Sequence, residues 1–447
     1  MGIGHRVLLG TVFGSALVFF LTVCHAEPPD DELAATTIRL ERTECFGTCP
    51  AYTVTIQGDG RVRFTSPVDD VKTGRRPSFE YRNVVLPGTH EDQIPVAAVA
   101  ALARQFHDTG FWRLRDVYQA EVTDSSSQII TLTVGTRRKT VRDYVGTEVG
   151  MPVAVRKLED AIDQAAGTDR WVRGTVELIP WLEKTGFDFH SRQAINLAVA
   201  GEEMEASEGL VATLVDRGAP LETAIDDDLV IGRNKAMRDF AGIALIKAAV
   251  KRGHAKVFTR LVAGGWLDRW GKEPASQTFA QNAAGCSPSL VDAMAAAGIP
   301  IDTATPVVDT LSSYESSGVT ALSALSNSYA CDGNEEARVA TASKLLEKGA
   351  NPNHRDSLGQ TPLYGVENLQ LLDLLLAKGG DAKARTNDGK SLVFGSWTDA
   401  IVLRLLEAGA SPNGKYFDGH TLAQQVKIQK MPRVGQWLAK HPEAAKR

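Results

Sequence analysis

A phrase that recurs every 30 residues in the last third of the chain most constrains its fold. The copies are LLEKGANPN at 345–353, LLLAKGGDAK at 374–383 and LLEAGASPN at 405–413. Each copy places a leucine pair on one side of a helix and follows it with a glycine, which suits the left-handed position that ends a helix. A unit this short cannot bury its apolar stripe alone, so the sequence predicts helical repeats that stack on one another.

A second marker precedes the copies, as GVTAL at 318–322, GQTPLY at 359–364 and GKSL at 389–392, and the series continues with GHTL at 419–422. In GQTPLY, Thr361 is predicted to cap a helix, with Pro362 and Leu363 in its first turn. Each unit is therefore expected to run through a cap, a helix, a turn, a second helix and a glycine stop.

The glycine stops extend the pattern backwards in weaker form. The marker glycines are Gly186, Gly218, Gly265, Gly298, Gly349, Gly379 and Gly409. We predict an all-α solenoid over 167–447 with about six to seven repeats, irregular over 167–300 and clearest over 318–422.

The GQTPLY and LLEKGANPN segments resemble the ankyrin repeat family, with Tyr364 where the family usually has histidine. The resemblance implies stacked helix pairs that bind a protein partner on the concave face, and it implies no chemistry. The units are shorter than the family's usual length of about 33 residues, so we expect trimmed helices or a trimmed turn. The alternative is a solenoid that only supports the N-terminal domain.

Residues 37–166 have a different pattern, which predicts an α+β domain with an antiparallel sheet and two helices. The expected elements are hairpins at 53–65 and 127–145, a strand at 78–87, and helices at 94–110 and 151–167. The first hairpin turns at Gly58-Asp59-Gly60 and the second at Gly135.

The first 26 residues have Arg6, an apolar run and then Ala26, a pattern that predicts a secretory signal peptide at 1–26, with a linker at 27–36. The alternatives are an uncleaved membrane anchor and a lipid anchor on Cys24. No later stretch is apolar enough to span a membrane. We therefore expect a periplasmic or extracellular protein.

Four cysteines follow the predicted signal peptide: Cys45, Cys49, Cys286 and Cys331. An even number in an exported chain favours disulfides, and their distance in sequence from histidines disfavours a metal site. Cys286 and Cys331 are expected between helices of neighbouring repeats, where a disulfide closing about 46 residues would contribute roughly 4 kcal/mol.

The segment CFGTCPAY at 45–52 contains the other two cysteines. Catalytic dithiols usually have two residues between them and lie at a helix N-terminus, whereas this pair has three and leads into a strand. We interpret it as a disulfide that holds a recognition loop, whose residues are Phe46, Gly47, Thr48, Pro50 and Tyr52.

This segment also resembles a family of exported bacterial domains of unknown function. The matching residues are Arg42, Cys45, Phe46, Gly47, Cys49, Pro50, Tyr52, Asp59 and Gly60, with a later segment from Asp116 to Asp124. The resemblance implies a fold and a compartment but no activity.

Catalytic and nucleic-acid functions find little support in the sequence. The HExxH, GxSxG and GxxxxGK[ST] motifs are absent, and the formal charge of −5 gives no basic patch for nucleic acid. Asp116, Glu121 and Asp124 form either a carboxylate cluster or a solvated loop. No cofactor and no metal are expected.

We expect a non-catalytic protein-binding module whose partner the sequence does not identify. One alternative is an inhibitor or immunity protein against an envelope toxin or hydrolase. Another is an enzyme or redox activity in the N-terminal domain.

Overall fold

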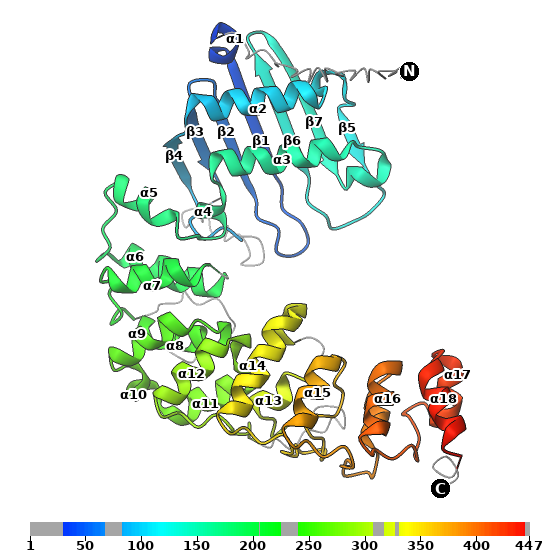
Figure 1. Cartoon of the computed structure of the whole chain (residues 1–447). Helices are drawn as coiled ribbons and strands as arrows, with labels where there is room; N and C mark the ends of the chain where they lie inside the picture. The colour runs from blue at the N-terminus through cyan, green and yellow to red at the C-terminus, as the bar shows by residue number, and fades with distance from the viewer. Residues whose placement is uncertain are drawn as a thin grey trace, which may run out of the picture. The chain divides into compact units, whose positions relative to one another are not determined.

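The computed structural model describes residues 30–67, 83–204, 206–224, 240–306, 317–326 and 330–442 (Figure 1). Two compact units divide the chain. The first holds the residues up to Thr43 with 52–65 and 89–166, and the second holds 44–51, 66–88 and the residues from Gly167 onward. The predicted signal peptide lies outside the described residues.

The first unit is built on a seven-stranded sheet in the order β4-β3-β2-β1-β6-β7-β5. The strands are β1 (Thr36–Arg42), β2 (Tyr52–Gln57), β3 (Arg61–Thr65), β4 (Thr89–Gln93), β5 (Val117–Gln119), β6 (Gln128–Val134) and β7 (Arg137–Tyr144). Neighbouring strands are antiparallel except β5, which runs parallel to β7. The predicted antiparallel sheet is therefore confirmed apart from this short edge strand.

Helices α2 (Val96–Asp108) and α3 (Val153–Ala166) cover one face of the sheet (Figure 1). The strands alternate, so that side chains such as Ile38 and Leu40 are buried while their neighbours lie on the other face. Burying a side chain of this size stabilises the fold by about 1.5–3 kcal/mol. The remaining elements are α1 (Asp30–Ala34) and two single turns, η2 (Phe111–Arg113) and η3 (Gly146–Val149).

Both predicted hairpins and both predicted helices of this unit are confirmed, but the strand predicted at 78–87 is wrong. Residues 83–88 form no strand, and residues 78–82 lie outside the described part. The amides of Val85 and Leu86 instead donate to the carbonyls of Val172 and Trp171, at 3.0 and 2.9 Å. The apolar run is thus buried against the helical segment that begins the second unit, and β4 forms from the polar residues after it.

The second unit is helical, as predicted. Its α-helices are α4 (Asp169–Val172), α5 (Leu178–Lys184), α6 (Arg192–Glu203), α7 (Glu208–Asp216), α8 (Ala241–Arg252), α9 (Ala255–Ala263), α10 (Trp266–Trp270), α11 (Lys272–Gln281), α12 (Pro288–Ala296), α13 (Ala321–Ala324), α14 (Glu335–Glu347), α15 (Leu369–Ala377), α16 (Asp399–Glu407), α17 (Leu422–Ile428) and α18 (Pro432–Lys440). Single turns η4 (Ala283–Cys286), η5 (Ala330–Gly333) and η6 (Leu392–Gly395) lie between them. No helix in the described ranges is long and apolar enough to cross a membrane.

One row of helices follows the order of the repeats. Helices α7, α9, α12, α14, α15, α16 and α18 each contact the next (Figure 1). Ion pairs connect successive members: Arg260 with Asp216 at 2.5 Å, Lys348 with Asp292 at 2.9 Å, and Arg404 with Asp373 at 2.6 Å. Each unit therefore bonds mainly to its neighbours, as in a solenoid.

The marker glycines end these helices by one recurring arrangement. Gly349, Gly379 and Gly409 have φ of 93°, 90° and 101°. The amides one residue later donate to the carbonyls of Leu345, Leu375 and Leu405, at 3.0, 2.9 and 2.9 Å. This is the Schellman arrangement. Gly186, Gly218 and Gly298 repeat it, whereas Gly265 leads directly into α10.

A tight turn also recurs every 30 residues, at 356–360, 386–390 and 416–420. We call these three segments the hairpin turns. Their first amides donate to the carbonyls of Gln360, Lys390 and His420, at 3.0, 3.0 and 2.9 Å. The first two hairpin turns are bonded together, because the Asn387 amide donates to the Leu358 carbonyl at 2.9 Å.

The helix predicted to follow Thr361 is wrong. Residues 362–365 form a single turn, which the Tyr364 amide closes on the Thr361 carbonyl at 2.8 Å, and the hydroxyl of Thr361 is buried with no hydrogen-bond partner. The backbone explains the shortening: a Cβ on Gly395 would lie 3.0 Å from the Gly365 amide. Consecutive units therefore approach closely at these two glycines, which leaves little room for a longer helix here.

The predicted Cys286–Cys331 disulfide is confirmed, with the two Cα atoms 5.4 Å apart. Each cysteine lies in a single turn, η4 or η5, before the helix of its own unit. Both have positive φ, 51° and 63°, so the bond forms between two turns and not between two helices.

Candidate recognition site

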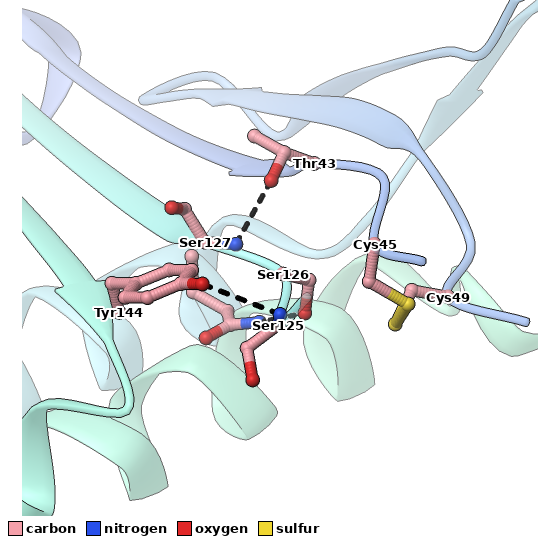
Figure 2. Close-up of a disulfide and its surroundings, with 8 residues drawn as sticks. Thr43, Cys45, Cys49, Ser125, Ser126, Ser127 and Tyr144 are labelled. Atoms are coloured by element: carbon pink, nitrogen blue, oxygen red, sulfur yellow. Dashed lines mark hydrogen bonds between the residues drawn. A yellow bond between two sulfur atoms is a disulfide. The ribbon is translucent and has the colours of Figure 1, made fainter. Parts of the chain in front are cut away.

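The segment that contains CFGTCP connects two paired strands, β1 and β2. Arg42 and Tyr52 are register partners, and residues 43–51 between them form what we call the cysteine loop. Within it, the Cys45–Cys49 disulfide is formed as predicted, with the Cα atoms 5.5 Å apart (Figure 2). Two disulfides in one chain are typical of a protein that matures in an oxidising compartment.

A single carboxylate of helix α3 holds both ends of the cysteine loop. Asp163 Oδ2 accepts hydrogen bonds from Arg42 Nη2 at 2.7 Å and Nε at 2.9 Å. Asp163 Oδ1 accepts a hydrogen bond from the Tyr52 hydroxyl at 2.8 Å. The Asp163 carboxylate raises the pKa of Arg42 against the opposing effect of burial, so the guanidinium stays charged. The outer residues of the motif therefore form the base of the loop.

The start of the loop is also fixed from the neighbouring strand. The Thr43 amide donates to the Ser127 carbonyl at 3.0 Å, and the Ser127 amide donates to Thr43 Oγ1 at 2.8 Å (Figure 2). Segment 125–127 is held in turn by Tyr144, whose hydroxyl accepts from the Ser125 amide at 3.3 Å. The loop thus leaves the sheet from a rigid base.

The tip of the loop carries an exposed aromatic side chain. Phe46 is 80% exposed, and Gly47 and Thr48 beside it are exposed as well. Gly47 has φ of 152° and closes a narrow turn by donating from its amide to the Cys45 carbonyl at 3.0 Å. Exposed phenylalanine on a cross-linked turn suits contact with a protein, because little conformational freedom is lost on binding.

The five residues predicted for recognition do not share one environment. Phe46, Gly47 and Thr48 lie on the surface and Pro50 is half-buried, but Tyr52 is only 6% exposed. Tyr52 belongs to the base of the loop through Asp163 and stacks on Phe64, with the ring centroids 5.2 Å apart. A partner would touch the tip and not Tyr52.

A buried acid that the sequence prediction missed lies beside this base. Glu159 of α3 is 2% exposed, and its Oε1 has no hydrogen-bond partner. Burial, reinforced by the nearby Asp143 carboxylate, raises the pKa of Glu159 to about 8, so the side chain is largely protonated at neutral pH. Its position could have been recognised, since Val155, Leu158 and Ile162 place it on the buried stripe of the helix.

Asp143 is the carboxyl neighbour of this acid. It is 1% exposed, accepts a hydrogen bond from the Gly146 amide at 2.6 Å and pairs with Arg156 at 3.2 Å. Two neighbouring buried carboxyls resemble the acid and base pairs of hydrolases. Here, however, both side chains are almost fully buried, and Asp143 is bonded to Gly146 and Arg156, which supports a structural network.

The sequence suggested a possible carboxylate cluster of Asp116, Glu121 and Asp124. All three residues are exposed. Asp116 pairs with Lys139, and Asp124 accepts a hydrogen bond from the Thr123 hydroxyl at 3.0 Å. Across the described ranges, no group of three or more His, Cys, Asp or Glu side chains could hold a metal ion.

Comparison with known proteins adds a relationship for part of the chain. A family model described as a domain of unknown function (DUF6438) matches residues 36–166. This agrees with the resemblance inferred from the CFGTCPAY segment. No curated protein matches the chain. No ankyrin family model is among the matches, so the ankyrin resemblance of the helical unit stays a prediction.

Proposed function

We propose that this is an exported, non-catalytic binding protein, in which an ankyrin-type array over 167–447 holds a protein partner in the periplasm. The observation that carries the proposal is the row of hairpin turns at a 30-residue spacing, of which the last, 416–420, carries the exposed side chain of Phe417. In ankyrin arrays, such turns and the short segments after them form the face that partners contact. The Schellman ends and the 30-residue spacing support the same architecture.

The last hairpin turn has the properties of a binding hot spot. Phe417 is 85% exposed and lies edge-on to Trp397, with the ring centroids 5.6 Å apart. Trp397 stacks on the buried Tyr416 at 4.6 Å. The Tyr416 hydroxyl donates to the carbonyls of Val393 and Ser396, at 3.3 Å each.

This aromatic cluster is held in place before any partner arrives. Burial raises the pKa of Tyr416, so its hydroxyl stays neutral and keeps donating. Trp and Tyr dominate interface energetics when they are anchored in this way, and a side chain such as Phe417 contributes to affinity when a partner covers it. We assign a second, smaller contact to Phe46 on the cysteine loop.

The proposal is tested by capture from a bacterial envelope extract, with the full chain as bait. We expect a specific partner to be retained by the wild type and lost at least tenfold from Phe417→Ala. Leu369→Ala is the matched control, because it removes another exposed apolar side chain, 41% exposed, from the start of helix α15. Equal retention by Phe417→Ala would overturn the assignment of the face.

The captured partner also separates the scaffold from the inhibitor. A toxin or hydrolase whose activity falls when the wild-type chain is added would favour inhibition. A partner whose activity is unchanged would favour a scaffold. Phe46→Ala, tested in parallel, is expected to weaken retention by less than Phe417→Ala.

A further inference from the structure

One face of the first unit's sheet is not covered by α2 and α3, and it carries a regular pattern of threonine and arginine. The register places Arg63, Thr55, Arg39, Thr131 and Thr140 in one row across strands β3, β2, β1, β6 and β7. This face belongs to the first unit, whereas the proposed protein binding belongs to the second.

A hollow of about 420 Å³ lies at one end of this face, over strands β5, β6 and β7. Thr140 is in its floor, and its hydroxyl is bonded to that of Thr131 at 2.9 Å. Arg138 and Arg142 flank Thr140 on the same face, because side chains two residues apart in a strand share a face. Both guanidinium groups therefore border one depression.

The two arginines have no acidic partner among the described residues, unlike the other charged groups nearby. Lys139 is paired with Asp116. On the adjoining strand, Arg39 is paired with Glu41 at 2.8 Å. The Arg142 side chain donates to the Ser127 hydroxyl, from Nε at 3.1 Å and Nη2 at 3.0 Å, which orients its guanidinium without neutralising it.

Two apolar side chains also line the hollow, together with the paired Asp116 and Lys139. Val117 of β5 is 50% exposed, and Ile129 of β6 is half-buried beside it. An exposed valine on an edge strand adds apolar surface next to two uncompensated cations. A ligand that fits would place an apolar body on Val117 and Ile129 and an anionic group between the arginines.

We propose that this hollow binds a small oxyanion, a phosphate or carboxylate carried on an apolar body. Arginine suits both groups, since its planar guanidinium donates two parallel hydrogen bonds to either. Asp116 also lines the hollow but pairs with Lys139, so the charge on the ligand would balance Arg138 and Arg142.

Calorimetric titration of the full chain tests this site. Phenyl phosphate and benzoate are the two probes, which separate phosphate from carboxylate as the preferred anion, and inorganic phosphate is the probe without an apolar body. We expect at least one of the aromatic probes to bind at least tenfold more tightly than inorganic phosphate. Heat from none of the three probes would overturn the proposal.

Variants then locate the binding. Arg138→Gln is expected to weaken the tighter probe at least tenfold, and it leaves the fold intact because this side chain is exposed. Arg142→Gln should have a similar effect. The matched control is Arg61→Gln, an arginine on the same face that is paired with Asp59 at 2.7 Å. Val117→Ser should weaken phenyl phosphate or benzoate while leaving inorganic phosphate unchanged.

Two results would contradict the site. Unchanged affinity in Arg138→Gln would show that the probe binds elsewhere. An equal loss in Arg61→Gln would show that the probes respond to the general charge of the face and not to the hollow.

Discussion

Asp163 connects residues that are far apart in the sequence, because Arg42 and Tyr52 of the CFGTCPAY motif both bond to its carboxylate. The motif residues themselves could be identified from the sequence. Their partner could not, since it lies more than a hundred positions later in the chain, on helix α3. The motif therefore predicted a loop, and only the structure shows what holds its base.

We expect Asp163→Ala to destabilise the first unit by about 3 kcal/mol, because it leaves the Arg42 charge without its carboxylate in a poorly hydrated place. Chemical denaturation measures the change. Asp160→Asn is the control, since Asp160 is 75% exposed and lies 3.8 Å from the same guanidinium. A loss for Asp160→Asn as large as for Asp163→Ala would contradict this account of the loop base.

Glu159 makes stability depend on pH. Folding raises its pKa from 4.5 to about 8, so the folded chain binds more protons than the unfolded chain between these values. The contribution of Glu159 to the free energy of unfolding is fully present below pH 4.5 and is lost as pH rises toward 8. Its full size is on the order of 3–5 kcal/mol.

Glu159→Gln removes this loss, because the amide does not ionise. The variant should therefore gain stability relative to the wild type as pH rises from 5 to 8. Denaturation midpoints of both proteins at several pH values check the prediction. A constant difference between them across that range would mean that Glu159 does not titrate as described.

At the scale of elements, local signals predicted the hairpins and the helix ends well. Glycine residues provided both signals. Gly60 and Gly135 lie in turns between strands, and the marker glycines take the left-handed conformation at helix ends. The failures have a tertiary cause. No strand forms over 83–87, because Val85 is bonded to Val172 and is buried against the helical segment. The helix predicted after Thr361 is only a single turn, where Gly365 and Gly395 approach closely.

The two disulfides should differ in their effect on stability. By loop length alone, loss of Cys286–Cys331 costs about 4 kcal/mol and loss of Cys45–Cys49 about 2 kcal/mol. Thermal unfolding of the paired serine variants, Cys286→Ser with Cys331→Ser and Cys45→Ser with Cys49→Ser, tests this order. The reverse order would mean that the Cys45–Cys49 disulfide stabilises more of the fold than the loop tip around Phe46.

For the whole molecule, the sequence predicted two kinds of structure, and both are found: an α+β unit and a helical unit of stacked elements. The repeat spacing was visible because each unit reuses the same stop and turn. The aromatic cluster was not, since Trp397 and Phe417 belong to different segments and come together only through the turn that Tyr416 anchors.

The central claim is that the hairpin turns bind a protein partner, and the most direct test is the dissociation constant of the purified chain with the partner captured from the envelope. We predict that Phe417→Ala raises it at least tenfold, a loss of about 1.4 kcal/mol, while Leu369→Ala leaves it within twofold. Equal affinity for the wild type and Phe417→Ala would contradict the claim.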